Sequence, residues 1–247
     1  MSFKIYKKLD QESVKEKKII TGEKLTDILF KINGERNSGT NFLAQLLDKN
    51  DIPIYVQKRD KNFIEHYKHG IPDNSVKQLN NTVIDIFIFR ELTSWLKSMF
   101  INHYELKVIE SFKNFLTQKQ YSNNYWKDNK TKDILNMGEN GKTIFEIRYY
   151  KYNAIVEYKN NNKNVIFISL GFIQNKNNCE NFLKSINEKY NLKRVDFICE
   201  ILKHTKINKN IKNRDYNIDI NEYIDIINNH KNNEIEDYIN NLTFEIF

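Results

Sequence analysis

Cysteines are few in this sequence, and long apolar runs are missing. The two cysteines, Cys179 and Cys199, form neither a disulfide framework nor a metal-ligand pattern, so a reducing compartment is expected. No stretch approaches the length of a membrane span, and the first residues lack the apolar core of a signal peptide. We therefore expect a cytoplasmic protein, in the host cytoplasm if the source is viral, without contact to a membrane.

The chain also lacks an internal repeat, a linker and a clustered basic tail. Its 247 residues suit a single domain over 1–247, in which residues 1–25 form a charged lead-in. Hydrophobic residues make up 40% of the chain, which excludes general disorder. The formal charge of +7 is compatible with an anionic ligand. Because the basic residues are scattered and not interleaved with aromatics on any one element, no nucleic-acid partner is expected.

Apolar runs and helical patterns alternate along the chain. A helix is expected to begin near Thr93, with Thr93 as its N-cap, and the C-terminal segment 218–247 is expected to be helical. The expected strands are 28–32, 54–56, 84–89 and 164–170, and the other expected helices begin at residues 41, 144 and 182. Strands that alternate with helices predict an α/β fold with a P-loop-type doubly wound parallel sheet flanked by helices.

The segment Gly34–Asn41 is the most informative motif. It joins an expected strand to an expected helix, and this arrangement directs backbone N–H groups and the positive end of a helix dipole toward an anion. Gly34 and Gly39 have the spacing of a Walker P-loop, but Thr40 and Asn41 replace its Lys-Ser/Thr pair. The loop is therefore poorly suited to hydrolysis of a magnesium-bound nucleoside triphosphate.

Residues Arg36 to Phe42 resemble the 5′-phosphosulfate loop of sulfotransferases that use 3′-phosphoadenosine 5′-phosphosulfate (PAPS) as donor. A second element strengthens the resemblance, because an expected strand ends at Arg90 and Ser98 follows eight residues later. In the family, an arginine and a serine at this spacing hold the 3′-phosphate. The resemblance implies that the donor contacts are Arg36, Asn37, Ser38, Gly39, Thr40, Asn41, Arg90 and Ser98.

The resemblance also implies catalytic residues. Lys68 and His69 lie in a Lys-His-Gly-Ile-Pro segment similar to the family's Lys-Thr-His-Leu-Pro, which makes His69 the expected general base. Asn37 occupies the position of the usual loop lysine, so Arg36 or Lys68 is expected to stabilise the leaving group. The implied reaction transfers a sulfuryl group to a hydroxyl or amine of a small molecule or glycan, without a metal.

Other interpretations remain open. His69 is also compatible with an ordinary turn histidine, and Asn37 with a nucleotide-binding protein that has lost catalysis. A third interpretation is a P-loop kinase of a nucleotide or small molecule, although the P-loop lysine and a clear Walker-B aspartate are missing. An active sulfotransferase and a related protein that has lost catalysis both predict binding of adenosine 3′,5′-bisphosphate without magnesium. A kinase instead predicts magnesium-dependent binding of ATP.

Overall fold

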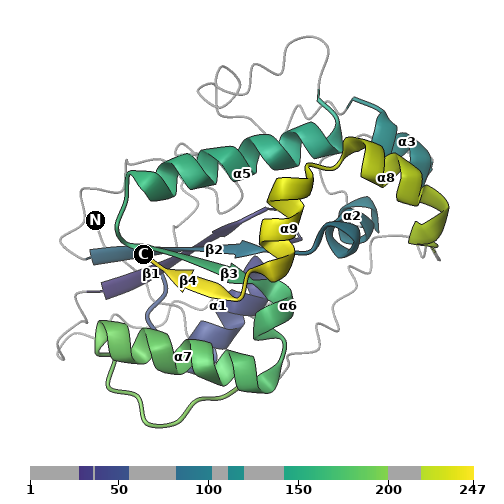
Figure 1. The fold of residues 1–247 in the computed structure, drawn as a ribbon. Helices are drawn as coiled ribbons and strands as arrows, with labels where there is room; N and C mark the ends of the chain where they lie inside the picture. The colour runs from purple at the N-terminus through teal and green to yellow at the C-terminus, as the bar shows by residue number, and fades with distance from the viewer. Residues whose placement is uncertain (1–27, 36, 56–81, 102–110, 120–141, 200–217) are drawn as a thin grey trace, which may run out of the picture.

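The computed structural model describes residues 28–35, 37–55, 82–101, 111–119, 142–199 and 218–247. Within these ranges the chain has an α/β fold in which helices flank a mostly parallel sheet (Figure 1). The strands are β1 (Ile28–Gly34), β2 (Thr82–Phe89), β3 (Val165–Ser169) and β4 (Phe244–Ile246). The helices are α1 (Thr40–Lys49), α2 (Leu92–Ile101), α3 (Phe112–Thr117), α5 (Ile144–Asn160), α6 (Leu170–Ile173), α7 (Lys176–Tyr190), the 3-10 helix η2 (Ile220–Tyr223), α8 (Ile224–His230) and α9 (Asn233–Asn241).

The sheet has the order β1-β2-β3-β4, and β1, β2 and β3 are parallel. Ile54 adds an isolated parallel bridge to Phe30 on the outer side of β1, where a short strand was expected. β4 runs antiparallel to β3, with Phe244 opposite Ile168 and Ile246 opposite Ile166. The expectation of a helical tail is therefore wrong for the last residues. Their alternating apolar side chains pair with the apolar edge of β3, which is what a strand requires.

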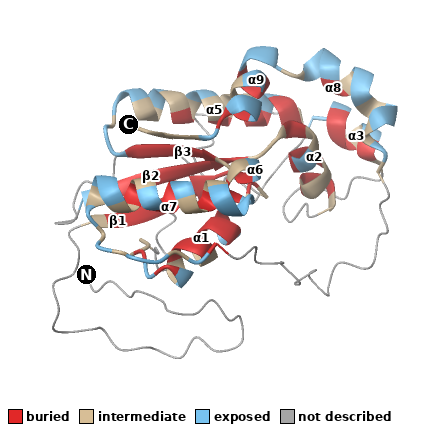
Figure 2. Ribbon diagram, turned by 60° about the horizontal axis from the view of Figure 1, so that its bottom comes forward, coloured by how far each residue is buried: buried red, intermediate tan, exposed pale blue. Residues whose placement is uncertain are grey.

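Two apolar layers enclose the sheet. On one face, α1, α6 and α7 pack against alternate strand residues, among them Phe30, Ile86 and Ile166. On the other face, α5 and α9 cover the intervening residues, such as Phe87 and Phe167. Figure 2 shows the buried sides of these helices turned toward the sheet. The strands are apolar on both faces because both faces are covered, which explains their nearly continuous hydrophobic sequences.

A third apolar cluster lies beyond the carboxyl ends of the strands, around α2, α3 and α8 (Figure 1). Trp95 and Phe100 of α2 pack there with Phe115 of α3 and Phe145 at the start of α5. This cluster fixes α2 beside the end of β2. No described helix is long and apolar enough to cross a lipid bilayer.

The cap of α2 and the start of α7 differ from expectation. α2 begins at Leu92, and its cap is Glu91 in place of Thr93, since the Glu91 carboxylate accepts from the backbone N–H groups of Thr93 and Ser94 at 2.8 Å each. The Thr93 hydroxyl is itself a donor to Glu91, at 2.6 Å. α7 begins at Lys176, six residues before the expected start, and the Asn175 side chain caps it. The apolar pattern did not reveal this start because the first turns of α7 are mostly polar.

The Glu91 cap gives a pH-dependent prediction. Burial raises the pKa of Glu91, but hydrogen bonds from Thr93 and Ser94 outweigh it and bring the pKa below the ordinary 4.5. A lowered pKa stabilises the fold above the unfolded-state value, and this contribution is lost as pH falls through the folded-state value. We expect Glu91→Gln to cost about 1 kcal/mol of unfolding free energy at neutral pH, as typical caps do.

Urea unfolding of parent and Glu91→Gln over a pH series measures this difference. It should shrink toward zero as the pH falls below 4.5, whereas a pH-independent difference would contradict the charged cap. Glu157→Gln, an exposed change on α5, is the matched control.

Candidate functional site

The candidate site lies where β1 and β2 end side by side. Gly34 pairs with Ile88 in the parallel register, so the loops that follow the two strands begin as neighbours. α1 then packs on one face of the sheet, whereas α2 joins the apolar cluster beyond the carboxyl ends of the strands, which includes the start of α5. In α/β sheets, ligands bind outside the carboxyl ends of strands at such a divergence.

The loop after β1 is a tight turn with two residues at positive φ, Asn37 at 60° and Gly39 at 105°. Asparagine tolerates the left-handed region better than most residues do, which gives Asn37 a backbone role that a lysine would fill less well. Ser38 is fully buried, and both its N–H and its hydroxyl donate to the Glu35 carbonyl, at 3.2 and 2.7 Å. The Ser38 hydroxyl thus holds the shape of the loop in this structure.

The N-terminus of α1 opens directly from this loop. Its N-cap residue, Gly39, has no side chain to cap the helix, and its first turn carries no acidic residue. The positive end of the helix dipole therefore has no neighbouring carboxylate on α1, an arrangement that favours an anion. Thr40 is buried at this end of α1, and Asn41 is exposed.

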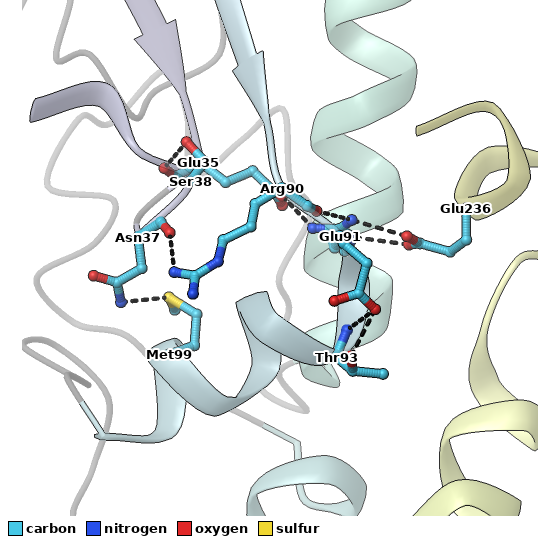
Figure 3. Close-up of polar contacts among 9 residues, drawn as sticks. Glu35, Asn37, Ser38, Arg90, Glu91, Thr93, Met99 and Glu236 are labelled. Atoms are coloured by element: carbon cyan, nitrogen blue, oxygen red, sulfur yellow. Dashed lines mark hydrogen bonds and ion pairs between the residues drawn. The ribbon is translucent and has the colours of Figure 1, made fainter. Parts of the chain in front are cut away.

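Asn37 connects the loop to the end of β2 (Figure 3). The Arg90 Nη1 atom donates to the Asn37 carbonyl at 3.0 Å. The Asn37 amide in turn donates to the Ser98 carbonyl and to the Met99 sulfur on α2, both at 3.2 Å. The structure therefore brings together Asn37, Arg90 and Ser98, which the sequence assigns to two separate phosphate contacts.

Arg90 is a half-buried cation at the end of β2. Burial lowers its pKa, against an opposing effect of Glu91, but a guanidinium stays protonated in proteins. Among the described residues, the one hydrogen bond of its guanidinium is the contact with Asn37, and no carboxylate lies within ion-pair distance of that guanidinium. A half-buried cation whose described partner is a neutral carbonyl has donors left for an anionic ligand.

A buried cluster of ion pairs adjoins the start of the loop at Glu35. Arg148 of α5 is 1% exposed, and its Nη1 atom lies 2.6 Å from Glu35 Oε2. Its Nε and Nη2 atoms donate to the two carboxylate oxygens of Glu236 on α9, at 2.7 and 2.9 Å. The sequence analysis missed this cluster. Its one sequence signal is that Arg148 lies four residues after Ile144, on the buried side of α5.

A cavity lined by described residues lies at the carboxyl ends of the strands, along the same edge of the sheet. It has a volume of about 430 Å³ and is bordered by Glu91, by Ser169 at the end of β3, and by the segment from Ile239 to Thr243. Within the described ranges, no group of three His, Cys, Asp or Glu side chains is arranged to hold a metal ion.

Three of the predicted site residues lie outside the described residues. They are Arg36 in the loop and the pair Lys68 and His69 in the segment 56–81. Their roles stay predictions from sequence.

Comparison with solved structures finds a distant structural likeness. The chain is similar to mouse sulfotransferase SULT7A1, whose crystal structure was determined in complex with PAP. The identity is 16%, the likeness covers 69% of this chain and 61% of the mouse chain, and the TM-score is 0.34. The chain thus spans about three fifths of the length of that structure. No protein-family model and no curated protein matches the sequence.

Proposed function

We propose that this protein transfers a sulfuryl group from PAPS to a hydroxyl or amine acceptor. The observation that carries the proposal is the hydrogen bond from Arg90 Nη1 to the Asn37 carbonyl. It joins the loop that resembles a 5′-phosphosulfate site to the strand end that resembles a 3′-phosphate site. Two phosphate contacts side by side suit a nucleotide with phosphate groups on both its 3′ and 5′ carbons.

The described residues fit such a donor. The loop and the N-terminus of α1 would receive the 5′-phosphosulfate, through the backbone at Gly39 and Thr40. Arg90 would donate to the 3′-phosphate, together with Ser98, whose backbone is already fixed by Asn37. A charge-assisted contact of Arg90 with phosphate is stronger than its contact with a neutral carbonyl.

Sulfuryl transfer depends mainly on positioning and charge stabilisation, as phosphoryl transfer does. A bond forms from the acceptor oxygen or nitrogen to sulfur, and the bond from sulfur to the bridging phosphate oxygen breaks, which releases adenosine 3′,5′-bisphosphate. His69 is the proposed base that takes the acceptor proton, and Lys68 or Arg36 the proposed cation at the leaving oxygen. The acceptor is proposed to be a small molecule or a glycan.

One observation favours a second candidate, a nucleotide-binding protein without transfer activity. Asn37 stands where the family has a loop lysine, and its amide is turned away to the Ser98 carbonyl and the Met99 sulfur. This side chain supplies no charge to the leaving group. Binding without turnover is therefore the alternative outcome for the same site.

Calorimetric titration tests the proposal. The parent protein is expected to bind adenosine 3′,5′-bisphosphate in the absence of magnesium and to gain nothing from added magnesium. Binding of ATP that requires magnesium, with no binding of the bisphosphate, would overturn the proposal in favour of a kinase. Transfer is then measured from radiolabelled PAPS to a panel of hydroxyl and amine acceptors. Binding without transfer to any of them supports the second candidate.

A further inference from the structure

Arg148 contacts both strand ends of the candidate site without facing it. Through Nη1 it binds the carboxylate of Glu35, the first residue after β1. Through Nη2 it donates to the Arg90 carbonyl, the first residue after β2, at 2.9 Å. One guanidinium thus binds the Glu35 side chain at the start of one loop and the Arg90 backbone at the start of the other. The planar arrangement of its donors fixes the separation of the groups it binds.

The rest of the Arg148 environment keeps the guanidinium in place. Glu236 on α9 accepts two parallel hydrogen bonds from the guanidinium. The central carbon of the guanidinium lies 4.7 Å from the centre of the Trp95 ring on α2. A bidentate pair of this kind is both strong and directional. Arg148 therefore connects α5, α9 and α2 to the two strand ends.

Glu35 depends on Arg148 for its position. One of its oxygens, Oε2, is paired with Arg148, whereas Oε1 is buried without a hydrogen-bond partner among the described residues. Burial raises the pKa of Glu35, although the Arg148 charge acts in the opposite direction. Removal of Arg148 would leave the buried Glu35 carboxylate with only the charge of Lys151 to oppose the effect of burial, and a poorly compensated group of this kind moves toward water or takes up a proton. Either change displaces the start of the loop.

We infer that Arg148 is a positioning residue, which holds the loop after β1 and Arg90 at the separation that lets one nucleotide reach both. This inference rests on the proposed function and deepens it, since it names what sets the selectivity for a doubly phosphorylated nucleotide. Arg148 acts through Glu35 and through the Arg90 backbone. A ligand with two phosphates gains from both contacts only when their spacing is held, whereas a ligand with one phosphate needs a single contact.

The experiment compares two ligands, adenosine 3′,5′-bisphosphate and adenosine 5′-phosphate, on the parent, Arg148→Met and Arg148→Lys. The measured quantity is the dissociation constant of adenosine 5′-phosphate divided by that of adenosine 3′,5′-bisphosphate, with the midpoint of thermal unfolding recorded for each protein. The ratio is expected to fall about tenfold in Arg148→Met. Arg148→Lys keeps the positive charge but loses the planar set of guanidinium donors, so its ratio should stay close to that of Arg148→Met. The control is Arg194→Met, because Arg194 pairs with Asp51 beyond the other end of α1.

A ratio equal to that of the parent in folded Arg148 variants, even with a lower unfolding midpoint, would overturn the inference and leave Arg148 a purely structural residue. If Arg148→Met does not fold, Glu236→Gln decides, since it keeps Arg148 and the shape of its partner. It is expected to lower the ratio about threefold, and an unchanged ratio overturns the inference. Failure of the parent to bind the bisphosphate would instead refute the proposed function, and the inference with it.

Discussion

Replacement of Arg90 by alanine is expected to weaken the binding of adenosine 3′,5′-bisphosphate by about 2–4 kcal/mol, or roughly 30- to 700-fold. The physical reason is the loss of a charge-assisted contact from a half-buried guanidinium, which water does not replace well. Adenosine 5′-phosphate lacks the 3′ group and should lose much less. The discrimination between the two ligands is therefore the diagnostic quantity.

Isothermal titration of both ligands against parent, Arg90→Ala and Arg90→Lys measures this discrimination. The lysine variant keeps a positive charge but loses the planar guanidinium donors, so it is expected to recover part of the affinity for adenosine 3′,5′-bisphosphate. Arg90 also holds the Asn37 carbonyl, so the loop loses a contact in both variants. Adenosine 5′-phosphate reports that shared effect. Equal losses for the two ligands would show that Arg90 supports the loop and does not select the 3′-phosphate.

The strands and helices that form the site could be predicted from local sequence. β1 begins at Ile28 as expected and extends two residues further, to Gly34, and α1 begins at Thr40, one residue before the expected start. Strands covered on both faces have continuous apolar sequences, and a helix after a glycine-framed loop has an apolar face. These signals are local, so tertiary packing does not have to be known to detect them.

The contacts between elements could not be predicted in the same way. Arg148 meets Glu35 and Glu236 across 113 and 88 residues of sequence, and one charged residue on an apolar face does not indicate its partners. Asn37 is a similar case. Its sequence position suggests a missing lysine, but its left-handed backbone and its contact with α2 depend on where α2 packs. The cap of α2 also differed from the expected one, because the Glu91 side chain makes the capping hydrogen bonds that were expected from Thr93.

Substitution of Gly39 by alanine is the second change with a large expected effect, in this case on the free energy of unfolding. Its φ of 105° lies where L-residues are strained, at a cost of about 1–3 kcal/mol. A Cβ atom at this position would also lie 2.7 Å from Leu170 Cδ1 and 3.2 Å from Ile88 Cδ1. Both neighbours are buried in the core, so crowding adds about 1–3 kcal/mol. Gly39→Ala is therefore expected to lower the free energy of unfolding by about 2–6 kcal/mol.

The direction of that Cβ decides how the substitution acts. It points beneath the loop toward Leu170 and Ile88, so the side chain would displace the loop from its support on the core. The matched control is Gly171→Ala, since Gly171 is exposed in α6 and a Cβ there has no neighbour nearer than 3.7 Å. Urea unfolding of the three proteins should show a large loss for Gly39→Ala and little or none for Gly171→Ala. If Gly39→Ala is as stable as the parent, the loop does not hold the left-handed turn on which the proposed donor site depends.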